Sequence, residues 1–246
     1  MAMLKKLVLF LLILSSPILL LAQIHPAVTH PVAIEQLSGF PNYPDDVKHI
    51  ITQAALISER QLTYLFGSAD PKNGGMDCSG TIHFLLKAVG LKDIPRSANE
   101  MYNWVKSKGR LHPVTTNDLN SPEFAELQPG DLLFWSGTYA VSGISHVMIY
   151  LGKDHQGKPL TFGASDGRTY MGQRMWGVSV FDFTLPRPGS KGAFVGYGCA
   201  PGLTCGGKTA RNSVLDFDES VSSKKEKVQA FDLSKPFQQS SPGMGI

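Results

Sequence analysis

Cys78 is the residue whose surroundings point most directly to chemistry. It follows Asp77, a favourable N-cap, and the apolar residues after it recur at helical spacing, at Ile82, Leu85, Leu86 and Val89. We therefore predict a helix that begins at Cys78. At a helix N-terminus the unpaired backbone N–H groups and the helix dipole favour the thiolate, which is the nucleophilic form of cysteine. The same N–H groups can stabilise the oxyanion that forms when a thiolate attacks a carbonyl.

The alternative interpretation of Cys78 is a small buried core residue, because free cysteines are often buried. Its neighbours Asp77, Ser79 and Gly80 are polar or small, and a helix N-terminus seldom lies deep in a core. The pattern favours a nucleophile.

A nucleophilic thiol needs a base, and His146 is the histidine whose context fits best. It opens an apolar stretch that predicts a strand, and a strand fixes a side chain better than a loop does. His83 shares the helix of Cys78 but lies about 140° around it, so it cannot face the thiol. The other histidines fall in the N-terminal segment, on the wet face of a helix or in polar loops: His25, His30, His49, His112 and His155.

The elements expected around this pair divide the chain into a helical half and a strand-rich half. Helices are predicted near residues 45–57 and 78–89, with a further helical turn at 101–105. A helical half followed by a run of strands indicates an α+β fold. The strands are predicted at 127–135, 146–152, 160–164, 177–183 and 193–197.

The two ends of the chain are expected to lie outside the folded domain. Lys5 and Lys6 precede an apolar run from Leu7 to Leu21, the pattern of a secretory signal peptide. The run is shorter than the roughly 20 residues of a membrane helix and contains Pro17, although an uncleaved anchor is the alternative. We interpret 1–22 as a signal peptide, 23–44 as a leader or linker, 45–205 as the domain and 206–246 as a mostly disordered tail.

The predicted signal peptide and the net charge limit the kinds of binding partner and the location that we expect. Without Lys5 and Lys6 the formal net charge falls from +3 to +1, which argues against the basic footprint of a nucleic-acid-binding protein. We expect an exported monomer of the periplasm or cell envelope, with no stable membrane span once the signal is cleaved.

The two remaining cysteines, Cys199 and Cys205, flank a Pro201-Gly202 turn. Close cysteines tend to pair in an oxidising compartment, so we hypothesise a disulfide between them. That pairing leaves Cys78 as a free, candidate reactive thiol. The cysteines show no CxxC spacing and the chain has no HExxH motif, so we expect neither a metal nor another cofactor.

Several motifs, taken in order, resemble the NlpC/P60 family of cell-wall endopeptidases. The combination and its spacings are specific, and the resemblance covers roughly residues 46–201. The matching residues are Tyr64 and Gly67, Asp77-Cys78-Ser79-Gly80, Pro95-Arg96-Ser97, Leu127-Gln128-Pro129-Gly130-Asp131-Leu132, and His146-Val147 through Tyr150-Leu151-Gly152.

This resemblance implies a reduced papain-like fold, with N-terminal helices, one of them bearing the cysteine, packed on an antiparallel β-sheet. It implies hydrolysis of peptidoglycan stem peptides, usually at the bond from D-γ-glutamate to a diamino acid. Cys78 is then the nucleophile and His146 the general base and acid. The residues implied to form the substrate site are Tyr64, Asp77, Ser79, Arg96 and Ser97.

Two positions depart from the family pattern. The family's third polar residue, usually a histidine that orients the catalytic imidazole, falls at Gly163, and glycine cannot hold a ring. Ser165, Asp166 or a backbone carbonyl would have to substitute, and our prediction for this third catalytic residue is Asp166. The second departure is Met101, where the family often has glutamine, and it bears on substrate detail more than on chemistry.

Gly163 also motivates an alternative from a different class, a catalytically silent peptidoglycan-binding protein that keeps the pocket. A thiol amidase or acyltransferase acting on another amide or ester is a further alternative. The retained Arg96-Ser97 and DCSG motifs favour a wall substrate.

Overall fold

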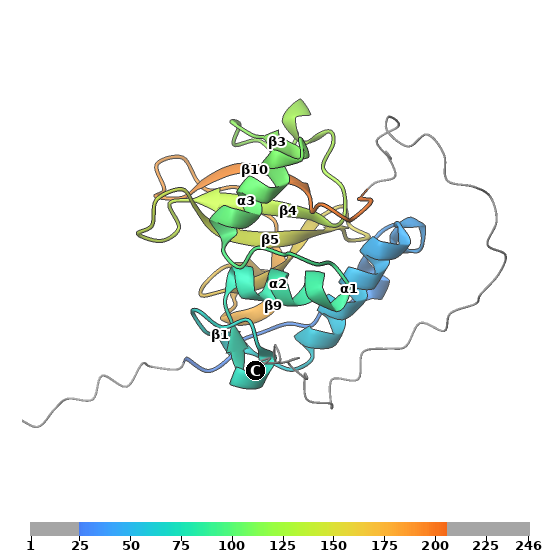
Figure 1. Ribbon diagram of the computed structural model, residues 1–246, viewed down its shortest axis with the longest axis vertical. Helices are drawn as coiled ribbons and strands as arrows, with labels where there is room; N and C mark the ends of the chain where they lie inside the picture. The colour runs from blue at the N-terminus through green and yellow to red at the C-terminus, as the bar shows by residue number, and fades with distance from the viewer. Residues whose placement is uncertain (1–24, 206–246) are drawn as a thin grey trace, which may run out of the picture.

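A six-stranded sheet lies at the centre of the computed structural model, which describes residues 25–205 (Figure 1). Its strand order is β3-β10-β4-β5-β6-β9, and every neighbouring pair is antiparallel. The signal peptide expected at 1–22 and the tail expected at 206–246 lie outside the described residues. The strands are β3 (Leu111–Pro113), β4 (Asp131–Ser136), β5 (Ile144–Lys153), β6 (Pro159–Ser165), β9 (Gly177–Asp182) and β10 (Ala193–Cys199).

Two short strand pairs accompany this sheet. β1 (Thr63–Tyr64) and β2 (Gly75–Met76) pair in parallel just before the cysteine-bearing helix. β7 (Thr169–Tyr170) and β8 (Gln173–Arg174) form a small antiparallel hairpin between β6 and β9.

Three α-helices, α1 (Asp45–Ser58), α2 (Cys78–Ala88) and α3 (Ala98–Ser107), pack on this framework. Helices α2 and α3 both contact β5, and α1 contacts both α2 and β9 (Figure 1). Helix α2 begins at Cys78 as predicted, and Gly90 just past its end takes a left-handed φ of 89°. The expected α+β fold, with N-terminal helices on an antiparallel sheet, is confirmed. Four 3₁₀ turns complete the elements: η1 (Ile34–Gln36), η2 (Phe40–Asn42), η3 (Pro71–Asn73) and η4 (Pro122–Phe124).

The central strands β4 and β5 are buried almost throughout. Their apolar residues form near-continuous runs because neighbouring elements cover the strands, so few positions are left for polar residues. Trp135 of β4 pairs in register with His146 of β5, and an aromatic cluster with Phe183 and Phe194 packs around that tryptophan. The strand that carries His146 is therefore held firmly.

Residues 25–44, predicted as a leader or linker, are instead part of the folded structure. Val28 forms a β-bridge with Trp176, and the backbone N–H of Val180 donates to the carbonyl of His30. Val32 and Leu37 are buried in the main core. The folded part therefore begins before residue 45. The sequence did not predict this because only two apolar core residues, Val32 and Leu37, lie within a stretch rich in proline and histidine.

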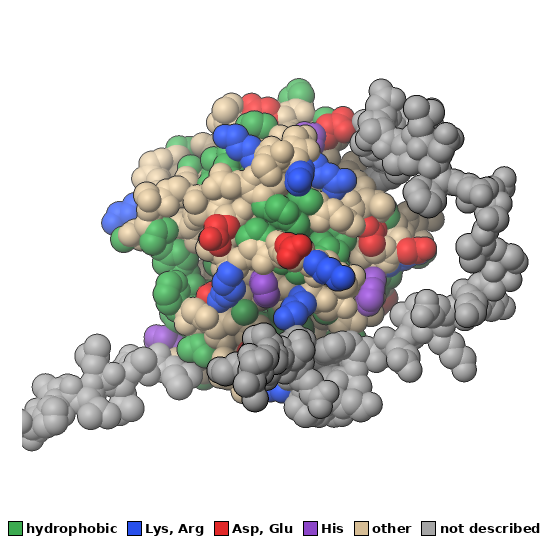
Figure 2. All heavy atoms as spheres, in the orientation of Figure 1, with side chains coloured by type: hydrophobic (Ala, Val, Ile, Leu, Met, Phe, Trp, Pro, Cys, Tyr) green, Lys and Arg blue, Asp and Glu red, His purple; other side chains and the backbone are tan. Residues whose placement is uncertain are grey.

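The pairing of Cys199 with Cys205 is confirmed: the two residues form a disulfide with their Cα atoms 5.8 Å apart. Within residues 25–205 no helix is both long and apolar enough to span a bilayer. On the face seen in Figure 2, basic and acidic side chains are interspersed.

Candidate active site

Cys78 lies at the first position of α2, and Asp77 caps that helix by accepting a hydrogen bond from the N–H of Gly80 at 2.6 Å. The second carboxylate oxygen of Asp77 accepts from the N–H of Gly67 at 2.8 Å, which ties the preceding loop to the helix start. A Cβ at Gly80 would lie 2.1 Å from the carbonyl oxygen of Ser68, so only glycine fits there. The DCSG motif thus sets the position of the sulfur.

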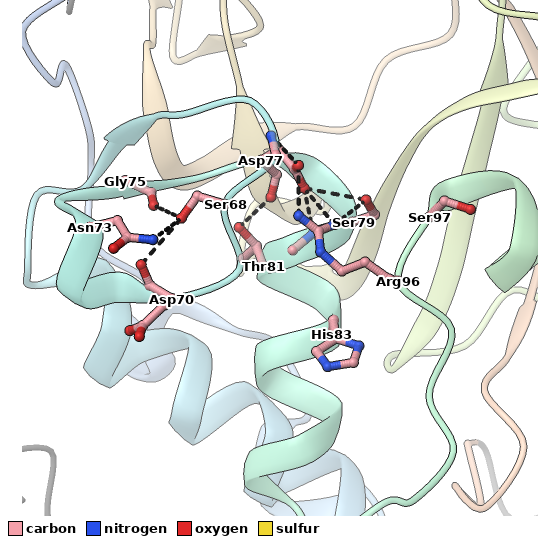
Figure 3. A network of polar contacts seen from close by, with 12 residues as sticks. Ser68, Asp70, Asn73, Gly75, Asp77, Ser79, Thr81, His83, Arg96 and Ser97 are labelled. Atoms are coloured by element: carbon pink, nitrogen blue, oxygen red, sulfur yellow. Dashed lines mark hydrogen bonds and ion pairs between the residues drawn. The ribbon is translucent and has the colours of Figure 1, made fainter. Parts of the chain in front are cut away.

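Arg96 closes over this helix start from the other side (Figure 3). Its guanidinium binds both carboxylate oxygens of Asp77, at 3.1 and 2.8 Å, and donates to the hydroxyl of Ser79 at 2.9 Å. Ser97, the next residue, caps α3 through a reciprocal capping box with Glu100. The structure therefore brings together the predicted substrate-site residues Asp77, Ser79, Arg96 and Ser97, but Asp77 and Arg96 mainly hold each other.

The Cys78 sulfur is buried, and its environment contains opposing influences on the thiol. Burial raises the pKa of Cys78 to about 11, and the negative charge of Asp77 adds to that rise. Hydrogen bonding by the backbone amides of Val147, Ser79 and Cys78 itself acts in the opposite direction and lowers the pKa. In the state described here the thiol is protonated, and three N–H groups stand ready to stabilise negative charge beside it.

His146 lies on β5 directly before Val147, whose amide reaches the Cys78 sulfur. Cys78 and His146 are thus brought to the same junction of α2 and β5, but in the described part of the chain no hydrogen bond joins the two side chains. The ring of His146 packs against Trp135 with centroids 5.6 Å apart. Burial lowers the pKa of His146 well below its ordinary value, and the charge of Arg168 lowers it further.

Arg168 is a site residue that the sequence reasoning missed. Its Nε donates a hydrogen bond to Nε2 of His146 at 3.3 Å, and its guanidinium carbon lies 4.1 Å from the centre of the Trp135 ring. A guanidinium can only donate, so Nε2 must carry the lone pair and the neutral imidazole must hold its proton on Nδ1. Arg168 therefore selects one tautomer of His146 and disfavours the imidazolium.

Among the described residues no hydrogen bond joins His146 to Asp166, the predicted third catalytic residue, although both line the same cavity. The carboxylate of Asp166 accepts a hydrogen bond from the hydroxyl of Tyr139 at 3.4 Å, and the hydroxyls of Tyr139 and Tyr64 are hydrogen-bonded to each other at 2.8 Å. The chain leaves β6 at Ser165, so Asp166 lies beyond the strand, and Arg168 rather than Asp166 returns to the imidazole.

Gly163 lies on β6 at the position where the family usually has its third polar residue. A Cβ at Gly163 would lie 3.3 Å from side-chain atoms of Met148. Met148 is two residues after His146 on β5, and it is buried. The thioether thus occupies the space beside Gly163, which explains why no polar side chain projects from that position.

Two cavities meet at Tyr139. The larger one, about 430 Å³, contains Cys78, and its lining surface is mainly apolar although polar residues contribute to the wall. Phe66 and Val141 on its wall are strongly exposed, at 80% and 57%. The smaller cavity, about 280 Å³, contains His146, Asp166, Arg168 and Arg174. The thiol and the imidazole therefore face adjoining spaces that one extended substrate could fill.

Of the described residues, the one cluster with the composition of a metal site is Asp131 with Cys199 and Cys205. The two sulfurs are bonded to each other, so they are not thiolate ligands in this structure.

Comparison with known proteins matches residues 61–176 to the NlpC/P60 family. The bifunctional muramidase/DL-endopeptidase CwlT of Bacillus subtilis (strain 168) is 31% identical over 107 residues, which cover 44% of this chain and 27% of that protein. The murein DD-endopeptidase MepH of Escherichia coli (strain K12) is 34% identical over 89 residues, covering 36% of this chain and 28% of the relative. The probable endopeptidase YafL of the same organism is 34% identical over 110 residues, covering 44% and 39% respectively.

The chain thus spans about a quarter to two fifths of the length of these curated relatives. The matched segment contains α2 with Cys78, β5 with His146 and the β7–β8 hairpin with Arg168. Residues 61–176 therefore form a domain of the NlpC/P60 family.

Proposed function

We propose that this protein is an exported cysteine peptidase that hydrolyses peptidoglycan stem peptides. The observation that carries the proposal is the junction of α2 and β5. There the Cys78 sulfur meets the backbone amides of Ser79 and Val147, next to His146. A thiol, an imidazole and converging N–H donors are the parts that acyl transfer to sulfur requires.

The proposed reaction passes through a thioester. His146 takes the proton from Cys78 as the sulfur attacks the scissile carbonyl, and the resulting oxyanion is stabilised by the N–H groups at the start of α2 and at Val147. The C–N bond then breaks, and the imidazolium gives its proton to the leaving amine. Water, deprotonated by the same imidazole, hydrolyses the thioester and returns the thiol.

The bond from D-γ-glutamate to a diamino acid is our proposed cleavage site. The printed names of the relatives include both a DL-endopeptidase and a DD-endopeptidase. A γ-DL-glutamyl hydrolase of Bacillus subtilis (strain 168) is also similar, at 29% identity over 133 residues that cover 50% of this chain and 27% of that protein. Two of these names favour a D-glutamyl bond, and cell-wall substrates in general favour an envelope location.

The test is a digest of isolated peptidoglycan and of purified stem peptides, read by mass spectrometry. We expect fragments whose masses place the cut after D-glutamate, and we expect Cys78→Ala and His146→Ala to abolish them. His83→Ala is a matched control, because His83 lies on α2 about 140° around the helix from Cys78 and its ring hydrogen-bonds the Pro95 carbonyl. Undiminished cleavage by Cys78→Ala would refute the proposal, and activity on ester substrates alone would favour the acyltransferase alternative.

A silent peptidoglycan-binding protein is the second candidate, and Arg168 is the observation that favours it. The arginine occupies the lone pair of His146, and burial raises the pKa of the Cys78 thiol to about 11. Digestion of stem peptides separates the two candidates. A peptidase releases fragments that the Cys78→Ala protein does not, whereas the silent protein binds stem peptides and leaves them intact.

A further inference from the structure

The β7–β8 hairpin brings two arginines into the cavity beside His146, and among residues 25–205 neither forms an ion pair with a carboxylate. Arg168 lies just before β7 and Arg174 ends β8. Ion pairs of the described chain include Lys48–Asp45, Arg96–Asp77 and Lys158–Asp182, and within residues 25–205 neither Arg168 nor Arg174 forms one. A cavity of about 280 Å³ with two unpaired guanidinium groups is suited to an anion.

The backbone is shaped to hold Arg174 at this cavity. A Cβ at Gly167 would lie 2.5 to 2.9 Å from the Arg174 guanidinium, so the missing side chain makes the room that this group occupies. Gly167 has a φ of 150°, a conformation that other residues rarely adopt. The Arg174 guanidinium donates to the backbone carbonyl of Asp166 at 3.3 Å, which leaves most of its N–H groups available.

Arg168 is held in the same cavity by contacts weaker than an ion pair. It lies over Trp135 and donates its Nε to an uncharged nitrogen of His146. Desolvation lowers the pKa of Arg168 to about 10, as expected for a cation without a neutralising partner. A carboxylate in the cavity would offer a stronger, charge-assisted and bidentate partner than the imidazole does.

We propose that this cavity is the subsite for a carboxylate of the substrate, with Arg168 and Arg174 as its ligands. This inference rests on the proposed function, because stem peptides carry free carboxylates on D-glutamate and on the diamino acid. When a carboxylate binds, Arg168 exchanges its bond to His146 for one to the ligand, and the Nε2 lone pair is released. The catalytic base is thus freed only when the substrate is seated.

The groups that face His146 fit this exchange. Arg168 faces it from the start of the hairpin and Trp135 from β4, while Asp166 and Tyr139 lie across the same cavity. Asp166 is the one carboxylate there, and it is engaged with Tyr139 rather than with either arginine. A second carboxylate can therefore bind without displacing an existing ion pair.

The test measures binding in the Cys78→Ala protein, so that cleavage cannot interfere. Calorimetry compares the tripeptide L-Ala-γ-D-Glu-meso-diaminopimelate with two analogues, one amidated on D-glutamate and one amidated on diaminopimelate. We expect amidation of the recognised carboxylate to weaken binding about tenfold or more, because a charge-assisted hydrogen bond is lost. The analogue that binds weakly identifies which carboxylate is seated.

The arginine variants assign the effect to this cavity. In the Cys78→Ala protein, a second substitution, Arg174→Gln or Arg168→Gln, should bring the affinities for the acid and amide peptides to within about twofold of each other. The exposed Arg60→Gln should leave the difference in affinity unchanged. The hydrogen bond of Arg174 goes to the Asp166 carbonyl and not to His146, so its variant remains informative if Arg168→Gln lowers the melting temperature.

Equal affinity for acid and amide peptides, no measurable binding of the acid form, or discrimination that survives both substitutions would each overturn the subsite. Peptidoglycan cleavage by the unmodified protein is measured in parallel. Cleavage without discrimination would refute the subsite and leave the peptidase proposal standing. A difference in affinity between acid and amide peptides without any cleavage would refute the peptidase proposal and leave the subsite standing.

Discussion

At the scale of single residues, the surroundings of Cys78 and His146 favour an uncharged pair. Burial raises the pKa of Cys78 and lowers that of His146, so both influences favour the neutral thiol and neutral imidazole. Arg168 reinforces this state because its positive charge opposes a second positive charge on the imidazole. The family usually has a polar residue that contacts the imidazole where this chain has Gly163. Here Arg168 contacts the imidazole instead and disfavours its protonation.

Replacing Arg168 with glutamine should therefore shift the pH dependence of the proposed peptidase. The amide can still donate to Nε2, but the nearby charge is gone, so the pKa of His146 rises. Since the base must be neutral, the acid limb of kcat/KM should move to higher pH by about one unit or more. Rates on a stem peptide between pH 4 and 8 measure this shift, and histidine NMR titration measures the pKa without relying on activity.

The exposed Arg60→Gln variant serves as the control for this change, and its acid limb should stay where it is in the unmodified protein. An Arg168→Gln protein with an unmoved acid limb and an unmoved His146 titration would show that the charge of Arg168 does not restrain the base.

At the scale of elements, the start of α2 depends on Asp77 more than on any other side chain. This carboxylate caps the helix at Gly80, fastens the Gly67 loop and neutralises Arg96. The same negative charge raises the pKa of Cys78, so the residue that positions the sulfur also opposes its ionisation. Asp77 therefore fixes the position of the Cys78 sulfur but makes its thiolate less favourable.

Asp77→Ala is expected to lower the free energy of unfolding by about 2 kcal/mol, because a buried cap is lost together with the hydrogen bonds from Gly67, Ser79 and Arg96. Asp77→Asn keeps an oxygen for the cap and should recover part of that loss. Urea denaturation measures both. Asp70→Ala is the matched control, since Asp70 is exposed and caps only the short η3 turn, so its loss should cost about 0.5–1 kcal/mol.

The elements that the sequence predicted well are those with a strong period or a strong cap. Helix α2 and strands β4, β5, β6, β9 and β10 follow from apolar spacing and from Asp77, and they place Cys78 and His146 on neighbouring elements. The β7–β8 hairpin escaped prediction because its two-residue strands are too short to show a period. Arg168 escaped with it, since its contact with His146 spans 22 positions and exists only after the hairpin folds back.

At the scale of the whole molecule, the segment before α1 completes the sheet. β9 is an edge strand, and the stretch from Val28 to His30 runs along it through a β-bridge with Trp176 and a hydrogen bond from Val180. Unpaired edges are liable to aggregate, so this cover has a physical use. At the other end of the described chain, the N–H and hydroxyl of Thr204 both donate to Asp46 on α1.

Leu37→Ala tests whether this N-terminal segment belongs to the cooperative fold. Leu37 is 3% exposed and packs in the main core, so its truncation should lower the free energy of unfolding by about 2–4 kcal/mol. Leu56→Ala on α1 makes the same chemical change at a side chain that is 42% exposed, and it should cost less than about 1 kcal/mol. Urea unfolding followed by tryptophan fluorescence compares the two. Equal small losses would mean that residues 25–44 are attached to the domain without stabilising it. A large loss confined to Leu37→Ala would place the start of the folding unit before residue 45.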